Sequence, residues 1–239
     1  MNLIEFIPNT DVKSSPVGAP ELLKDIQEIQ PVPASKVIPS WYKRLSANVE
    51  PEARTIKSCR PVHELIHTGY ILPLWADHEF RWAADGQEIT AVSPHTQAGH
   101  PGPQLGQQLH TNLGYQSSAI KFISPWIIKT PPGYSCLFMK PFFHFEDRFT
   151  VMPAIVNTDK YDEMINFPAL VMDDIPVPFT VDIGYPLVHI IPFKRESWKS
   201  KVSELTKAMF NKKGTIRYYL LNRAKHTYHK FCKVNPSFK

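Results

Sequence analysis

The sequence lacks long apolar runs and has few cysteines and glycines. Its 239 residues include 3 Cys, 10 Gly and 23 Pro. No stretch approaches the ~18 consecutive apolar residues of a membrane-spanning helix. The N-terminus has no basic region followed by an apolar core, so we expect no secretion by a signal peptide. Three widely spaced cysteines are typical of a reducing compartment, and we therefore expect a cytoplasmic location.

Two common enzyme motifs are also missing. The sequence contains no glycine-rich phosphate-binding loop and no Gly-x-Ser-x-Gly nucleophile elbow. Ser135 and Cys136 follow the turn predicted at Pro131-Pro132-Gly133, but no residue that could act as a general base lies near them in the sequence. These absences leave metal-assisted chemistry and binding as the function classes to consider.

Short apolar stretches separated by turn residues dominate the first 193 residues. They predict about eight to ten strands, and hence a mainly β domain, as a β-sandwich or jelly-roll-like barrel, with short N-terminal helices. The two helices are expected near residues 20–29 and 38–45. The segments Ala119 to Lys129 and Tyr134 to Phe145 flank Pro131-Pro132-Gly133, which predicts that they form a hairpin.

The charge is unevenly distributed between this β-rich domain (1–193) and the remaining residues, 194–239. The net charge of +5 combines a basic C-terminal segment, with 13 Lys and Arg against 2 acids, and a mildly acidic remainder. Apolar residues in this segment recur at helical spacing, including Trp198 and Val202 and a second stripe over 216–231. We expect a basic helical segment packed on the β-rich domain.

Such a segment has several interpretations. Bases alternate with aromatic residues, which is typical of nucleic-acid binding, and Arg217, Arg223, Lys225 and Lys230 are the candidate contacts. An acidic protein surface or an anionic lipid surface would also attract this charge, and so would the protein's own acidic domain. A plain solvated helix face explains the same pattern.

His63-Glu64-Leu65-Ile66-His67 matches the His-Glu-x-x-His signature of zinc hydrolases. On a helix the two histidines share one face and bind zinc, while the glutamate acts as general base on the zinc-bound water. Pro61 and Gly69 bracket a helix of about two turns. No third ligand follows at a known spacing, and the alternative is a short helix with solvated polar side chains.

A second metal hypothesis comes from the strands. His144 and Glu146 lie two residues apart and therefore on one face of a strand, and His189 lies on a later strand. Two histidines and one carboxylate form the ligand set of non-haem Fe(II) oxygenases. The alternative is three unrelated, half-buried strand residues, so neither zinc nor iron is favoured as a cofactor.

Several short phrases occur along the middle of the chain. They are Ile38-Pro39-Ser40-Trp41-Tyr42-Lys43, Cys59-Arg60-Pro61, Gly69 to Trp75, Trp126 to Ser135, Asn157 to Tyr161, Ile165 to Pro168, Gly184 to Leu187 and Ile191 to Glu196. Together they resemble a family of uncharacterised proteins from tailed phages, especially marine ones, over about residues 38 to 198. The resemblance implies a phage product acting in the host bacterial cytoplasm or in the virion, and it implies no activity and no catalytic residue.

The leading hypothesis from the sequence is a non-enzymatic phage accessory or virion structural protein that binds a partner. The expected partner is a virion or host protein, or a second copy of the chain. The alternatives are a metal-dependent enzyme, as a zinc hydrolase or an Fe(II) oxygenase, and a nucleic-acid-binding protein that uses the basic C-terminal segment.

Overall fold

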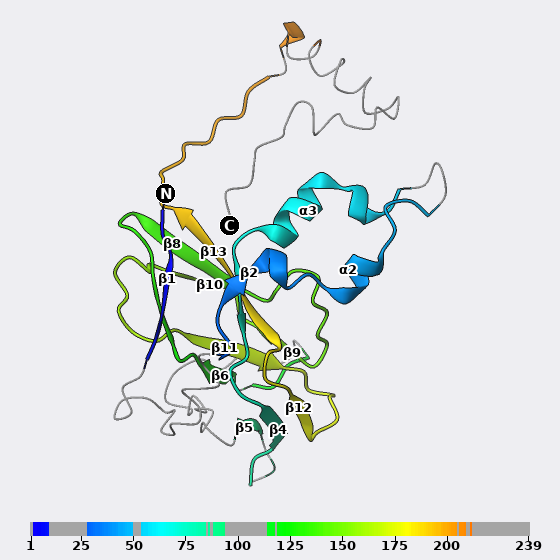
Figure 1. Ribbon diagram of the computed structural model, residues 1–239, viewed down its shortest axis with the longest axis vertical. Helices are drawn as coiled ribbons and strands as arrows, with labels where there is room; N and C mark the ends of the chain where they lie inside the picture. Colours follow the sequence, from blue (N-terminus) through cyan, green and yellow to red (C-terminus); the bar gives the residue numbers. More distant parts are fainter. Residues whose placement is uncertain are drawn as a thin grey trace.

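The computed structural model describes residues 2–9, 28–49, 54–84, 86, 88–93, 114–117, 119–204, 206–208 and 211. These residues form a mainly β structure with short helices, which confirms the prediction that the chain is mainly β (Figure 1). None of the described helices combines the length and apolar character needed to cross a membrane. The described strands are β1 (Glu5–Pro8), β2 (Val32–Pro33), β3 (Tyr70–Pro73), β4 (His78–Trp82), β5 (Ile89–Val92), β6 (Ile120–Ile123), β7 (Trp126–Lys129), β8 (Tyr134–Met139), β9 (Phe149–Val151), β10 (Ala154–Val156), β11 (Asn166–Val171), β12 (Phe179–Val181) and β13 (Pro186–Lys194).

The strands pair in four antiparallel sheets. The largest has the order β10-β8-β13-β3-β2, and two three-stranded sheets have the orders β6-β11-β9 and β12-β4-β5. The fourth sheet pairs β1 with β7. Most paired strands are far apart in sequence, so the fold depends on long-range contacts rather than on local hairpins.

One hydrophobic core joins the sheets. Phe138 on β8 lies 5.5 Å, between ring centroids, from Phe167 on β11, which connects the five-stranded sheet to its three-stranded neighbour. Phe80 on β4 stacks on Phe179 at 4.5 Å and on Phe149 at 5.5 Å. Rings of this size bury large apolar areas, and their offset contacts add to the stability of the core.

Strand β13 is the longest of the described strands and lies at the centre of the largest sheet. It pairs with β3 through residues 186–190 and with β8 through residues 189–194. Leu187 to Ile190 are all buried, as expected for a central strand that is covered on both faces. In Figure 1 it runs from beside β9 to the point where the C-terminal chain leaves the sheets.

The predicted hairpin over residues 119–145 is wrong. Pro131-Pro132-Gly133 does turn the chain, and Tyr134 N–H donates to Pro131 C=O, but β7 and β8 do not pair with each other. Instead β7 pairs with β1, and β8 pairs with β10 and β13. The amide of Thr130 donates to Thr158 C=O, which draws the turn toward a distant segment.

The described helices are short and lie on one side of the sheets: η1 (Ala34–Lys36), α2 (Ser40–Arg44), η2 (Ile56–Ser58) and α3 (Arg60–His67). Two of them match the predictions for residues 38–45 and for the segment between Pro61 and Gly69. Gly69 has a φ of 73°, a conformation that favours glycine and ends α3 before β3 begins. The helix predicted over 20–29 lies almost wholly outside the described residues.

The helical stripe predicted to begin at Trp198 is wrong over residues 195–204, although residues 207, 208 and 211 are helical. Residues 195–204 form no helix where the structure describes them, and Trp198 and Val202 are 87% and 101% exposed. These side chains therefore do not pack on the β-rich domain. The second stripe, over 216–231, lies outside the described residues.

Candidate functional site

The two histidines of the His-Glu-x-x-His motif lie side by side on α3. Their rings stack with centroids 4.0 Å apart and planes inclined by 18°. The lone pairs of a ring lie in its plane, so stacked rings direct them along nearly parallel lines. Two ligands of a tetrahedral zinc ion must instead point at one common centre. Ring stacking thus holds His63 and His67 in an arrangement unsuited to shared metal binding.

His67 and Glu64 of the motif have partners other than a metal ion. His67 Nδ1 lies 2.6 Å from His63 O, and Glu64 is paired with Arg60 at 2.9 Å. Burial, and then the neighbouring His67, lower the pKa of His63 below its ordinary value. Within the described part of the chain, no group of three His, Cys, Asp or Glu residues is placed to hold a metal ion. The described residues therefore give the motif no third ligand.

The predicted iron ligands do not converge either. His144 Nε2 lies 2.9 Å from Val37 O, and His189 Nε2 lies 2.6 Å from Thr68 O, so each ring donates to a backbone carbonyl. Glu146 binds Arg148 through both carboxylate oxygens at 2.8 Å. Burial alone opposes ionisation of Glu146, but the hydrogen bonds from Arg148 outweigh it and lower its pKa. All three side chains hold the fold together, and the triad prediction is not supported by their geometry.

His144 instead belongs to an open pocket with aromatic walls, which we call the aromatic pocket. Its volume is about 380 Å³, which lies within the range of small-molecule and side-chain binding sites. One wall is the segment that leads into α2, and the other is the turn between β8 and β9, with the start of β13 alongside. The lining residues are Val37, Ile38, Pro39, Ser40, Trp41, Phe143, His144, Phe145, Tyr185 and Pro186.

Two hydrogen bonds hold the walls of the aromatic pocket together. Trp41 Nε1–H donates to Phe143 O at 2.8 Å, and the ring of His144 donates to Val37 O. Phe143 has a φ of 62°, a left-handed conformation that costs a non-glycine residue about 1–2 kcal/mol. Such strained residues persist where the surroundings fix them, and they cluster at ligand-binding sites. These contacts therefore hold the two walls of the pocket in fixed positions relative to each other.

The mouth of the aromatic pocket exposes a large ring. Phe145 is 74% exposed and lies 5.6 Å from Trp41, between ring centroids, at an interplanar angle of 33°. Phe143 contacts the same indole edge-on at 6.1 Å. Exposed aromatic residues grouped around a recess are typical of protein-binding surfaces, where Trp and Tyr supply much of the binding energy.

The aromatic pocket was not predicted from the sequence. A signal was present, because Phe142-Phe143-His144-Phe145 places four rings in succession. Successive side chains of a strand point to opposite faces, so a run of rings cannot all enter one core. The pairing of this run with the α2 segment, over 100 residues earlier, was not visible from the sequence.

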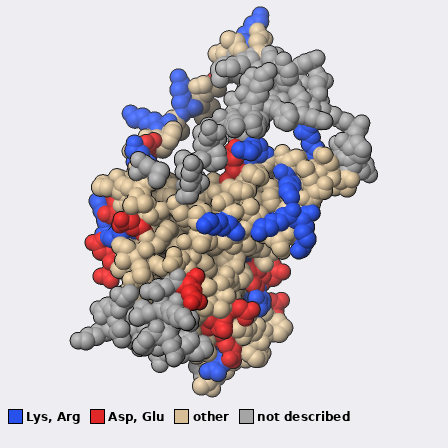
Figure 2. Space-filling view, in the orientation of Figure 1, with Lys and Arg blue, Asp and Glu red and all other residues tan. Residues whose placement is uncertain are grey.

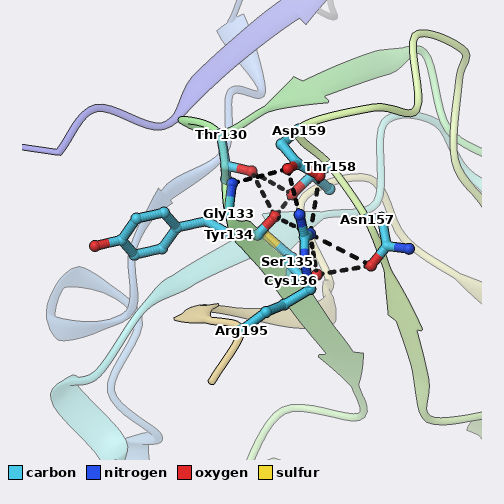
Figure 3. Close-up of polar contacts among 9 residues, drawn as sticks. All are labelled: Thr130, Gly133, Tyr134, Ser135, Cys136, Asn157, Thr158, Asp159 and Arg195. Carbon is cyan, nitrogen blue, oxygen red and sulfur yellow. Dashed lines mark hydrogen bonds and ion pairs between the residues drawn. The ribbon is translucent and has the colours of Figure 1, made fainter. Parts of the chain in front are cut away.

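A second polar cluster lies at the opposite end of β13, around Arg195 (Figure 3). The Arg195 guanidinium bonds both carboxylate oxygens of Asp159 and also donates to Ser135 Oγ at 2.8 Å and Tyr134 O at 2.7 Å. Ser135 in turn donates to Asn157 Oδ1 at 2.8 Å. We call this group the Arg195 clamp.

The residues of the Arg195 clamp hold segments of the fold together, and none of them is activated for catalysis. The hydrogen bond from Arg195, followed by that from the amide of Gly133, lowers the pKa of Asp159 to about 2. Asp159 is thus a fixed anion and a poor proton acceptor. Ser135 contacts an amide and a cation rather than a base, so its hydroxyl is not activated as a nucleophile. Burial raises the pKa of Cys136 to about 11, which keeps that thiol protonated.

The four basic residues predicted to contact nucleic acid, Arg217, Arg223, Lys225 and Lys230, lie outside the described residues. The nucleic-acid hypothesis for the C-terminal segment remains a prediction. No protein-family model matches the sequence, and no curated protein is significantly similar to it.

Proposed function

We propose that this protein acts by binding another protein rather than by catalysis, and that the aromatic pocket is its contact site. The observation that carries the proposal is the exposed ring of Phe145 beside Trp41 at the mouth of a preorganised recess. Soluble proteins expose single apolar residues routinely, but grouped and exposed aromatic residues mark sites of interaction.

The walls of the aromatic pocket favour an apolar side chain of a partner. Its main polar groups are already used, since Trp41 Nε1 and His144 Nε2 both bond backbone carbonyls. Burial is the main reason that the pKa of His144 is lowered, so the ring is neutral near pH 7. A charged small molecule finds no free counter-charge among these groups. An inserted aromatic or aliphatic side chain gains contact area with every wall.

The setting that we propose for this binding is a tailed phage. Its support is the sequence resemblance over residues 38–198, and the protein would then be an accessory or virion structural protein. We further propose that the sheets pack as a sandwich or jelly-roll-like barrel, supported by the contact of Phe138 with Phe167 between two sheets. Mass spectrometry of purified particles tests the virion assignment, and absence from particles would leave a partner in the host.

Site-specific photo-crosslinking tests the binding proposal. Ser40 lines the aromatic pocket and is exposed, so a photoreactive residue placed there would report on the occupant. We expect a discrete adduct with one protein during infection, identified by mass spectrometry. Isothermal titration calorimetry with that purified protein should then show binding that Phe145→Ala weakens at least tenfold.

A matched control separates the pocket from surface aromatic residues in general. Tyr161 is 42% exposed and lies near the Arg195 clamp, away from the aromatic pocket, so Tyr161→Ala should leave the affinity unchanged. The proposal fails if no adduct forms from position 40. It also fails if the adduct and the affinity are the same in wild type and Phe145→Ala.

A further inference from the structure

The chain that follows β13 exposes a tryptophan without any cover from the described residues. Residues 196–204 are all exposed and form neither helix nor strand, and Trp198 is 87% exposed. We call this segment the arm. Tryptophan is largely buried in most folded proteins, and its large ring is costly to leave in water. The arm therefore presents an anchor residue that calls for a partner surface.

The arm begins at a fixed point. Arg195 is held by the Arg195 clamp, and its amide donates to Gly133 O at 2.8 Å. Trp198 follows only three residues later, so the fixed position of Arg195 limits the positions that Trp198 can reach. In Figure 1 the arm leads away from the sheets rather than back along them.

We propose that Trp198 of one copy inserts into the aromatic pocket of a second copy, so that the arm links two molecules of this chain. This inference rests on the proposed function, since it names the occupant of the same pocket. An indole ring against Trp41, Phe143 and Phe145 gains edge-on and offset ring contacts as well as burial of apolar area. Tryptophan is also among the residues most enriched at the centres of interfaces.

The arm does not reach the aromatic pocket of its own molecule. The pocket includes Pro186, the first residue of β13, whereas the arm starts after Lys194, the last. At ~3.3 Å per residue, the eight steps of this strand span about 26 Å. Four further residues to Trp198 extend at most about 14 Å, which leaves a gap that an indole side chain does not bridge. A Trp198 side chain that occupies the pocket must therefore come from another copy.

Charges of both signs lie beside the aromatic pocket, and only the acids complement the arm. Asp147 and Asp182 are exposed and lie, in sequence, two and three residues from Phe145 and Tyr185, which line the pocket. On the α2 wall, Lys36 and Lys43 are exposed and lie one and two residues from Val37 and Trp41. Lys199 and Lys201 flank the tryptophan on the arm and are also exposed.

Figure 2 shows cations along the arm, further cations on the side of the short helices, and acids gathered toward the β4 and β12 end of the described surface. Contacts of Lys199 and Lys201 with the acids beside the pocket would orient the arm as Trp198 enters.

Sedimentation of the full chain tests the proposal, over concentrations on the order of 1 to 300 μM because so small a contact has modest affinity. We expect wild type to self-associate with increasing concentration. Trp198→Ala and Phe145→Ala should each weaken this association at least tenfold, and Tyr161→Ala should not. All three side chains are exposed, so the variants should fold, which circular dichroism checks.

A mixing experiment gives the sharpest outcome. Trp198→Ala keeps an intact pocket and Phe145→Ala keeps an intact arm, so a mixture of the two should form a heteromeric complex that neither forms alone. A wild type that stays monomeric at all concentrations overturns the inference, as does association that persists in Trp198→Ala. In either case an adduct between position 40 and a different protein would still support the proposed function.

Discussion

Replacing Gly69 with alanine should destabilise the protein strongly, because this residue passes close to β13. A Cβ atom at Gly69 would overlap the carbonyl oxygen of Ile190 and lie 3.2 Å from its carbonyl carbon. Both neighbours are backbone atoms of a central strand, and Ile190 pairs with Tyr70, the residue after Gly69. The new methyl group therefore requires β3 and β13 to move apart.

The loss of stability in Gly69→Ala has two parts, backbone strain and displaced neighbours, and the same substitution at Gly184 measures the first part alone. The left-handed conformation of Gly69, with φ of 73°, costs an alanine about 1–2 kcal/mol, offset by about 0.4–1 kcal/mol of lost freedom in the unfolded chain. Displacing packed backbone adds about 1–3 kcal/mol. Gly184 has a φ of 82° with nothing within 4 Å of an added Cβ, so Gly184→Ala pays the first part alone. We therefore expect about 1–5 kcal/mol for Gly69→Ala and about 0–1.6 kcal/mol for Gly184→Ala, so that the two differ by about 1–3 kcal/mol.

Urea unfolding followed by tryptophan fluorescence measures both values, provided that the dependence on urea concentration is the same in each variant. Equal destabilisation by the two substitutions would refute the reasoning. It would mean that Gly69 does not approach Ile190 and that the register of β3 against β13 is shifted. That register places Pro186 at one end of β13 and Lys194 at the other, so the result also bears on the distance between the aromatic pocket and the arm.

Three further predictions concern titratable and metal-ligating groups. The pKa of Asp159 is lowered to about 2, so its contribution to stability is complete above the ordinary value near 4 and is lost as the pH falls toward 2; the difference in urea midpoint between wild type and Asp159→Asn should shrink over that interval. Cys59 is exposed and Cys136 is buried with a raised pKa, so a variant whose third cysteine is replaced by serine should show one fast-reacting thiol in Ellman's assay at pH 8 and a second only after unfolding. Protein purified without chelator should carry no stoichiometric zinc, and EDTA should leave its Tm unchanged, because the stacked rings of His63 and His67 do not share a centre; one zinc per chain that is lost in a His63→Ala variant would contradict this.

The sequence predicted the mainly β class correctly, but it predicted fewer strands than the structure describes and a hairpin that does not form. About eight to ten strands were expected and the described residues form 13, because a strand as short as the two-residue β2 has no periodicity that a sequence pattern reveals. Pairing is not local: β7 lies next to β8 in the chain but pairs with β1, more than 100 residues earlier. The two prolines between β7 and β8 remove two backbone donors that a continuous hairpin ladder would use. A turn signal therefore indicated where the chain bends and not which strands become neighbours.

The two predicted metal sites are not supported by the structure, and the aromatic pocket was not predicted. Both outcomes depend on contacts that a sequence pattern does not specify. His63 to His67 matched a catalytic pattern, yet the pattern specifies spacing on a helix and not the ring rotation that separates stacking from metal binding. His144 and Glu146 do lie near each other in sequence, but Val37 and Arg148 provide better partners for them. The aromatic pocket depends on two segments 100 residues apart, so only the fold brings it together.

The opposite placement of the arm and the aromatic pocket restricts the assemblies that this chain can form. A contact from Trp198 of one copy to Phe145 of the next uses two different surfaces, and such heterologous contacts build rings or open filaments. If both arms exchange at once across a two-fold axis, the same contact closes as a dimer.

Because Arg195 is fixed by its clamp, the length and direction of the few residues up to Trp198 decide between these outcomes. Asp159→Asn weakens the hold on Arg195. It should therefore change the distribution of assemblies without removing the contact between Trp198 and the aromatic pocket. A single closed species in wild type that becomes a mixture in this variant would show that the Arg195 clamp sets the geometry. An unchanged distribution would mean that the docked surfaces set it instead.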